Sequence, residues 1–295
     1  MIDQQYWALL TTRDRPGPLR RTLNSLLEQS VPPKQIVILD DGSSDPSVRK
    51  VLDDFPSIHN IIQRNTPYDI RRLVKNWNRC LRYAEDNGFA NLDFVLITAD
   101  DCVYPRTYTE DITFRMRRDS VVVASGNRGL KSPPDGWKPP EGSGRIIDSQ
   151  FLRRIGFRFP EQAGYEPWIV YEALRLGYNV ACYNDLSYAH ITEFGGSHRF
   201  TEWSFMPHAL GYDPFFFYAR CIKNMLNGDL PKQAALRMMI GYILAPLRSY
   251  DDESFYRYFS PELREFVSHF QRRRLLMALS RFVKPFRGTP DRATA

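Results

Sequence analysis

Apolar and polar residues alternate through the first two thirds of the chain in a pattern that predicts strands followed by helices. Short apolar runs typical of buried strands occur at 6–11, 36–39, 61–63, 93–98, 121–124 and 179–183. Apolar residues recur at helical spacing within 19–27, 46–52, 70–84 and 168–176. This alternation predicts an α/β fold in which helices cover the faces of a sheet.

Two further stretches depart from this pattern. Residues 126–144, GNRGLKSPPDGWKPPEGSG, are rich in glycine and proline, which predicts a mobile surface loop. From about residue 205 the alternation ends, and aromatic and basic helices follow. We therefore expect a catalytic domain over 1–205 and a helical, basic and aromatic C-terminal region over 206–295.

The composition is that of a soluble globular protein. Of 295 residues, 43% are hydrophobic and 25% are charged, and no apolar run approaches the roughly 20 residues that a membrane span requires. The first residues, MIDQQYWALL, lack the basic and apolar regions of a signal peptide, so we expect a cytoplasmic protein. The four cysteines form no C-x-x-C pair, which indicates reduced, buried thiols rather than a zinc site or disulfides.

Acidic residues follow two of the predicted strands. Asp40 and Asp41 lie in IVILDDGSSD, and Asp100 and Asp101 end DFVLITADD. Ligands of open α/β sheets bind at the carboxyl ends of the strands, and neighbouring carboxylates there need hydrogen-bond donors or a cation. Nucleoside hydroxyls supply donors, and Mn²⁺ or Mg²⁺ supplies a cation that prefers hard oxygen ligands. The pattern predicts a nucleotide and metal site at this edge of the sheet.

The alternative is that each acid pair caps a helix and faces water. Two such strand ends in one sheet favour the ligand site. The glycine motifs that cradle phosphates, G-x-G-x-x-G and G-x-x-x-x-G-K-[ST], are absent. A metal, rather than a glycine-rich loop, is therefore expected to hold the phosphates.

At these same segments the chain resembles a known family. VILDDGSSD and VLITADDCVYP, about sixty residues apart, are similar to the two signatures of family 2 glycosyltransferases of the GT-A fold. The resemblance extends over roughly 5–205 and includes TTRDRPGPLRRTLNSLLEQS and EPWIVYEALRLGYNVACYNDLSYAH. It implies a GT-A type mixed sheet flanked by helices, with a helical C-terminal extension. The implied activity is inverting transfer of a sugar from a UDP-, GDP- or dTDP-sugar to the hydroxyl of a glycan or lipid-linked acceptor, with no nucleic-acid partner.

The resemblance also implies which residues hold the nucleoside. Thr11 and Arg13 would border the base, and Asp41 would bond to it with Asp40 nearby. Of the arginines on the helix after the third strand, Arg72 is the best match and Arg71 the alternative. The other interpretation of these arginines is an exposed helix face.

The family's metal motif, D-x-D, corresponds here to Thr98-Ala99-Asp100, so Thr98 replaces its first acid. Asp100 and Asp101 are the expected metal ligands, either of which could bind directly, and Asp100 would also border the nucleotide. His190 matches a histidine that ligates the metal or touches the diphosphate, although a lone histidine after a strand is often structural. His198 and Arg199, in GGSHRF, are expected to close over the diphosphate.

The family's catalytic base lies at the start of a helix, in a Glu-Asp pair. Counting back from Gly177 places Glu166 at the Asp position and Tyr165 at the Glu position. The resemblance implies that Glu166 deprotonates the acceptor hydroxyl, which attacks the anomeric carbon in one displacement. The alternative is that Glu166 only stabilises the helix start beside Pro167.

Residues 272–287, RRRLLMALSRFVKPFR, combine an apolar helical stripe with Arg and Lys and contain no acid. Such a basic amphipathic helix can lie on an anionic membrane surface, which would make the protein peripheral on the inner face of the membrane. Packing on the catalytic domain or on a second subunit is an equal alternative. Two other functions also remain open from sequence: a sugar nucleotidyltransferase and a non-catalytic binding protein for anionic surfaces.

Overall fold

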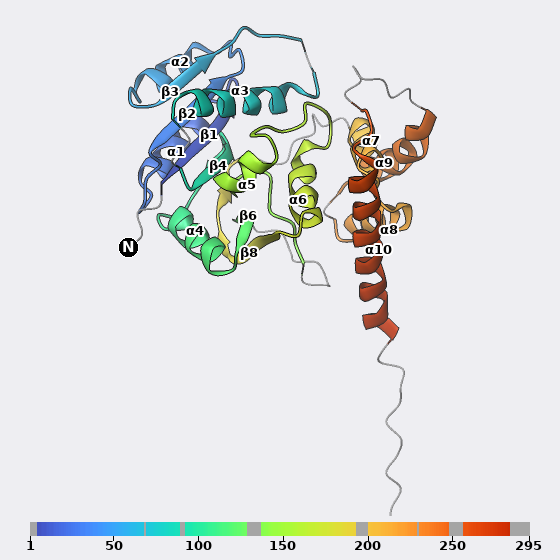
Figure 1. Ribbon diagram of the computed structural model, residues 1–295. Coiled ribbons are helices and arrows are strands. Elements are labelled where there is room, and N and C mark those ends of the chain that lie inside the picture. The colour runs from blue at the N-terminus through green and yellow to red at the C-terminus, as the bar shows by residue number, and fades with distance from the viewer. Residues whose placement is uncertain are drawn as a thin grey trace, which may run out of the picture. The chain divides into compact units, whose positions relative to one another are not determined.

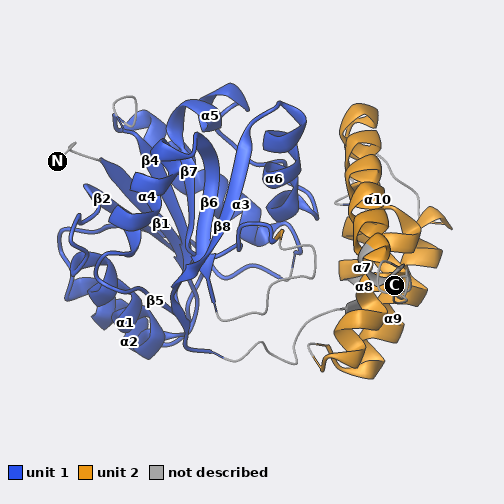
Figure 2. Ribbon diagram, turned by 90° about the horizontal axis from the view of Figure 1, so that it is seen from below, with its two compact units in different colours: residues 1–131, 138–198, 250–257 blue, residues 132–137, 199–249, 258–295 orange. Residues whose placement is uncertain are grey.

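The chain divides into two compact units, which are coloured separately in Figure 2. The computed structural model describes residues 5–67, 69–88, 92–128, 137–192, 200–228, 230–247 and 256–283. Unit 1 comprises 1–131, 138–198 and 250–257, and unit 2 comprises 132–137, 199–249 and 258–295.

Unit 1 is built on a mixed sheet of seven strands (Figure 1). Their order is β3-β2-β1-β4-β7-β6-β8, and β7 alone of these runs antiparallel to its neighbours. The strands are β1 (Tyr6–Thr12), β2 (Gln35–Asp40), β3 (His59–Ile62), β4 (Phe94–Ala99), β6 (Val121–Asn127), β7 (Arg145–Asp148) and β8 (Asn179–Ser187). The predicted α/β class with a mixed sheet is confirmed.

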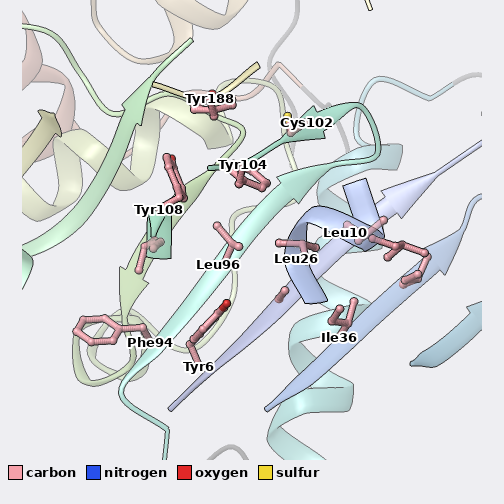
Figure 3. Close-up of a cluster of buried hydrophobic side chains, with 14 of the residues drawn as sticks. Tyr6, Leu10, Leu26, Ile36, Phe94, Leu96, Cys102, Tyr104, Tyr108 and Tyr188 are labelled. Carbon is pink, nitrogen blue, oxygen red and sulfur yellow. The ribbon is translucent and has the colours of Figure 1, made fainter. Parts of the chain in front are cut away.

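Helices cover both faces of this sheet. They are α1 (Pro16–Leu27), α2 (Pro46–Asp53), α3 (Arg72–Asp86), α4 (Tyr108–Arg118), α5 (Ser149–Arg154) and α6 (Tyr165–Arg175). Tyr6 and Leu10 of β1 pack with α1, α2 and α4 in one buried cluster (Figure 3). Trp7 and Leu9 alternate with them, are also buried and face the opposite side, where α3 contacts β1.

An aromatic contact places α6 on the same face as α3. The ring centroids of Trp77 on α3 and Tyr165 on α6 lie 5.4 Å apart in an edge-to-face arrangement. The fold is thus three layers, and the inner strands β1, β2 and β4 are buried on both faces, whereas the edge strands β3 and β8 are partly exposed.

Local sequence signals explain how the first helices begin. Pro16 occupies the first position of α1, where its missing N–H costs nothing. Asp45 caps α2 by accepting the Ser47 N–H at 2.8 Å, as predicted. The predicted third strand is shifted slightly, since β3 covers His59–Ile62, and α6 begins at Tyr165 rather than at residue 168.

Residues 138–144 of the predicted surface loop contain no helix or strand, as expected, but Pro140 and Gly144 are buried and the other five are only partly exposed. Side chains satisfy the backbone of this segment: Tyr188 donates to the Ser143 carbonyl and Tyr108 to the Gly144 carbonyl, both at 2.7 Å. The segment leads into β7, whose four residues carry too short a pattern to be predicted.

A second, two-stranded sheet was also not predicted. It pairs β5 (Cys102–Val103) with β9 (Ala189–His190), and Cys102 lies opposite His190. The Ile191 N–H donates to the Asp101 carbonyl at 2.8 Å and extends the pairing. This small sheet brings the second acid pair next to a histidine from far along the chain.

Unit 2 is helical in its described part. It contains α7 (Phe200–Ala209), α8 (Pro214–Leu226), α9 (Lys232–Leu244), a 3₁₀ turn (Ala245–Leu247) and α10 (Pro261–Val283). Asp213 caps α8 and pairs with Arg272 of α10 at 3.1 Å, while Phe217 and Tyr242 stack with centroids 4.4 Å apart. Among the described helices, none combines the length and apolar character needed to cross a bilayer.

The turn after β2 depends on a glycine. Gly42 has φ +74°, and a Cβ there would lie 2.4 Å from the backbone nitrogen of Asn65. We expect Gly42→Ala to lower the free energy of unfolding by about 1–3 kcal/mol, measured by denaturant titration. Gly17→Ala in α1, where a Cβ meets nothing within 4 Å, is the control and should leave stability unchanged or raised. Equal losses in the two variants would contradict this account.

Candidate functional site

The candidate site lies where the parallel strands end. β1 pairs with β2 on one side and with β4 on the other, so the chain changes direction across the sheet between β1 and β4. Thr12, the last residue of β1, bridges this point, because its hydroxyl donates to Asp100 Oδ2 at 2.8 Å. Open α/β sheets bind their ligands at such a switch point.

Asp41 and Arg72 lie next to each other on one side of the site. Arg72 Nε lies 2.5 Å from Asp41 Oδ2, and Arg72 Nη2 donates to the Asp41 carbonyl at 2.9 Å. Gln63 donates to the other carboxylate oxygen of Asp41. The two predicted residues are therefore brought together as a nearly buried ion pair.

An open cavity of about 450 Å³ lies beside this pair. Its lining consists of Arg13, Asn65, Thr66, Pro67 and Arg72. Arg13 Nη2 donates to Asn65 Oδ1 at 2.8 Å, which fixes the arginine at the cavity wall. The volume is in the range of small-ligand pockets, and its donors are suited to a nucleoside.

Three other predicted residues lie close to this cavity but have local partners. Asp40 accepts the Ser43 N–H at 2.9 Å and so holds the turn after β2. Thr11 is half-buried beside Ala99 in the sheet register. Arg71, the alternative to Arg72, pairs with Asp69 at 3.1 Å.

The second acid pair is almost completely buried. Asp100 and Asp101 are 4% and 2% exposed. Burial raises the pKa of Asp100, and the Thr12 hydrogen bond and the Arg15 charge oppose this rise. Arg15 Nη1 lies 3.0 Å from Asp101 Oδ2 and 3.5 Å from Asp100 Oδ1. The guanidinium of Arg15 is thus a positive charge that Asp100 and Asp101 share.

His190 completes a cluster that could hold a metal ion. Its Nε2 lies 3.3 Å from Asp101 Oδ1, and its Nδ1 lies 3.0 Å from the Thr192 carbonyl, which fixes the ring. One ligand atom each from Asp101, Cys102 and His190 fall within 4.8 Å of one another.

The donor set fits a hard or borderline divalent cation. Burial and the Asp101 charge raise the pKa of the Cys102 thiol to about 11, and hard cations prefer oxygen and imidazole ligands over sulfur. Carboxylate and imidazole remain, a combination that suits Mn²⁺ and, less well, Mg²⁺. Asp101 and His190 are therefore the residues best placed to bind the ion, with Asp100 adjacent.

Thr98 stands at the position of the replaced acid, and its hydroxyl already has a partner outside the Asp101, Cys102 and His190 cluster. It is 1% exposed, and its hydroxyl is bonded to the Tyr104 hydroxyl. Figure 3 shows Tyr104 close to Tyr108 and Tyr188 within the buried cluster. The threonine therefore belongs to the core below the site.

Glu166 lies in the first turn of α6, after Gly164 at the N-cap. Burial raises its pKa, which the charges of Arg145 and Arg128 partly offset. A Cβ on Gly142 would lie 2.9 Å from Glu166 Oε1, so the 138–144 segment passes directly over the carboxylate. Because Tyr188 holds the adjacent Ser143, this segment links Glu166 to the strand that carries His190.

Arg145 supports this arrangement from below, although sequence reasoning missed it. It is 3% exposed, and its guanidinium donates to three carbonyls: Glu141 at 2.9 Å, Glu166 at 2.9 Å and Pro140 at 3.1 Å. Arg15, Thr12 and Asn65 were missed as well, although Arg15 and Thr12 stand in the predicted TTRDRPGP segment. His198 and Arg199 lie outside the described residues.

Comparisons with known proteins agree with this geometry. The model described as Glycosyl transferase family 2 matches residues 8–170, more than half of the chain. No curated protein matches the chain.

Three solved structures illustrate the structural likeness. Mannosyltransferase PcManGT from Pyrobaculum calidifontis, in complex with GDP-Man and Mn²⁺, is 15% identical with a TM-score of 0.55, over 96% of this chain and 81% of that one. S. aureus TarS 1-349 in complex with UDP-GlcNAc is 16% identical with a TM-score of 0.52, over 95% and 81%. In a longer TarS structure, 16% identical with a TM-score of 0.51, 85% of this chain matches and spans 44% of TarS. These likenesses confirm the GT-A fold.

The partly buried carboxyl of Glu166, whose pKa is raised, should cost stability at neutral pH. A carboxyl whose pKa is raised by folding stabilises the protein at low pH, and this contribution is lost as pH rises through the raised pKa. Glu166→Gln stays neutral, so we expect its melting temperature to exceed that of the wild type by a margin that grows from pH 4 to pH 8. Circular dichroism melting curves measure this margin. Glu172→Gln, which breaks a pair with Arg175 in the same helix, should give no such gain.

Proposed function

The chain belongs to glycosyl transferase family 2, and we propose that it transfers a sugar from a nucleotide-sugar donor to an acceptor hydroxyl, with inversion at the anomeric carbon and dependence on Mn²⁺ or Mg²⁺. The observation that carries this proposal is the convergence of Asp100, Asp101 and His190 at the carboxyl ends of the strands, beside a cavity lined by donors. Membership of this family argues against the nucleotidyltransferase and the non-catalytic binding protein.

The nucleoside occupies the cavity beside Asp41 and Arg72. Asp41 accepts a hydrogen bond from the base, and Arg13 and Arg72 supply donors and positive charge at the wall. Support comes from the pairing that fixes Asp41 and from the neighbours, whose structures contain GDP-Man or UDP-GlcNAc. Asp40 supports this subsite indirectly, because it accepts the Ser43 N–H and so holds the turn after Asp41, and Thr11 lies one residue before Thr12 at the end of β1.

The metal is held by Asp101 and His190, with Asp100 alongside. A bound divalent ion supplies positive charge that stabilises the leaving nucleoside diphosphate. Thr12 and Arg15 meanwhile keep Asp100 and Asp101 in place. The manganese in the mannosyltransferase complex and the carboxylate–imidazole donor set both support Mn²⁺.

Glu166 is the general base. Its raised pKa makes the carboxylate a stronger base than an exposed glutamate, which suits removal of a proton from an acceptor hydroxyl during attack. Arg145 donates to the Glu166 backbone carbonyl and so fixes the helix start, while its charge opposes the rise in the pKa of the Glu166 carboxyl. One displacement at the anomeric carbon, from the face opposite the diphosphate, inverts the configuration.

The acceptor is a hydroxyl on a lipid-linked glycan, presented at an anionic membrane. On α9, four exposed residues follow one helical stripe that continues into the 3₁₀ turn: Leu236, Ile240, Ile243 and Leu247. Neither α8 nor α9 contains an acid, and together they carry Arg220, Lys223, Lys232 and Arg237. On α10, Leu276 and Leu279 are 60% and 52% exposed next to arginines. Apolar and basic surfaces of this kind support interfacial binding.

Donor binding is tested by thermal shift with UDP-, GDP- and dTDP-sugars, with and without Mn²⁺. We expect one nucleotide to raise the melting temperature, by the equivalent of about 2.7 kcal/mol at a hundredfold excess over its Kd. Asp101→Asn should lose the Mn²⁺-dependent part of the shift. Glu166→Gln should keep the full shift while turnover falls roughly 10²- to 10⁴-fold.

Asp53→Asn, at an exposed pair with Arg49 on α2, is the control for these variants and should behave as the wild type. An absence of any shift with all three nucleotides would contradict the proposed donor. Equal turnover by Glu166→Gln and wild type would exclude Glu166 as the base.

Membrane binding is tested by co-sedimentation with phosphatidylglycerol vesicles. We expect the wild type to bind them and to bind phosphatidylcholine vesicles less. Ile240→Ser with Ile243→Ser, and separately Leu276→Ser with Leu279→Ser, should weaken binding by roughly tenfold or more, because each buried side chain contributes about 1.5–3 kcal/mol. Phe114→Ser, at a 61% exposed position of unit 1, is the control. Binding that is unchanged in both double variants would refute the membrane proposal.

A further inference from the structure

The side chain of Arg15 contacts both members of the second acid pair, Asp100 and Asp101. A single nitrogen, Nη1, contacts both acids, at 3.0 Å from Asp101 Oδ2 and 3.5 Å from Asp100 Oδ1. The acid side chains are 2% and 6% exposed, whereas that of Arg15 is 46% exposed. A buried anionic pair is therefore covered by a cation that remains half in solvent.

The backbone explains how Arg15 reaches this position. It immediately precedes Pro16, the first residue of α1, and has φ −133° and ψ 60°, outside the helical region. Its side chain makes no capping hydrogen bond to α1. The guanidinium is thus directed from the β1–α1 loop to the end of β4, across the switch point of the sheet.

Two adjacent buried carboxylates are unfavourable without positive charge, because they repel each other and have lost their hydration. Among the described residues, the positively charged groups within 4 Å of these acids are the Arg15 guanidinium and, when protonated, His190. A divalent ion bound to Asp101 would take over the same charge compensation. Two cations close to one carboxylate would then repel each other.

Resting on the metal-dependent function proposed above, we propose that Arg15 is an internal counter-ion that competes with the divalent metal for Asp101. When metal binds together with the nucleotide, Arg15 exchanges the carboxylates for the diphosphate. Arginine is suited to this exchange because its planar, permanently charged guanidinium pairs equally well with carboxylate and phosphate.

The competition gives Arg15 two effects of opposite sign on ligand affinity. It weakens binding of metal alone, because the ion must displace it from Asp101. It strengthens binding of the metal with a nucleoside diphosphate, because the released guanidinium gains an anionic partner. A residue that only supports the fold would not produce this reversal.

The test measures Mn²⁺ affinity by electron paramagnetic resonance, without and with UDP or GDP, whichever gives the larger thermal shift. We expect Arg15→Gln to bind Mn²⁺ alone about tenfold more tightly than the wild type, and the nucleotide with Mn²⁺ about tenfold more weakly. Arg20→Gln removes a 45% exposed arginine of the same helix that pairs with Asp54, and should change neither affinity.

Arg15→Lys keeps the positive charge but lacks the planar guanidinium. Its affinities for Mn²⁺, alone and with nucleotide, should lie between those of the wild type and Arg15→Gln. It also tests the proposal if Arg15→Gln fails to fold. An Arg15→Gln affinity for Mn²⁺ alone that is equal to or weaker than that of the wild type overturns the competition. An absence of Mn²⁺ binding in every variant, with nucleotide present, overturns the metal-dependent function as well.

Discussion

The structure depends on how two adjacent carboxyl groups are kept buried at the end of a β-strand. Asp100 and Asp101 are almost fully excluded from solvent, where two carboxylates repel each other and lack hydration unless hydrogen-bond donors or positive charge compensate. The hydroxyl of Thr12, the guanidinium of Arg15 and the ring of His190 together supply that compensation. They come from the end of β1, the loop directly after it and β9, so the acids hold together two segments that are distant in sequence.

This constraint explains why the sheet order matters. β1 lies between β2 and β4, so the loop after β1 can contact both acid pairs at once. The Asp41 N–H donates to the Thr12 carbonyl at 2.9 Å, while the Thr12 side chain bonds Asp100. One residue at the end of β1 thus connects the proposed nucleoside subsite beside Asp41 with the Asp100–Asp101 pair.

Much of the sheet and of the candidate site could be predicted from sequence, because parallel strands and their acidic ends carry strong local signals. The apolar runs over 36–39 and 93–98 predicted β2 and β4, and the acids after them lie at one edge as expected. What could not be predicted depends on contacts between distant residues. β7 has four residues and β9 two, and the position of Gly142 next to Glu166 accompanies hydrogen bonds that Tyr188 and Arg145 donate to carbonyls of that segment. Arg15 in turn has no sequence signal separating it from its basic neighbours.

The direction of β7 determines which parts of the chain form each side of the site. The other strands of the sheet present their last residues at this edge, whereas the antiparallel β7 presents its first residue, Arg145, together with the segment that leads into it. The proposed nucleotide subsite is therefore assembled from strand ends, and the surroundings of the proposed base, Glu166, from the chain segment that enters β7. Changes within 138–144 can then alter the acceptor side of the proposed reaction while its donor side keeps its geometry. Under the proposed function, a single scaffold can in this way acquire new acceptors without losing its activated sugar.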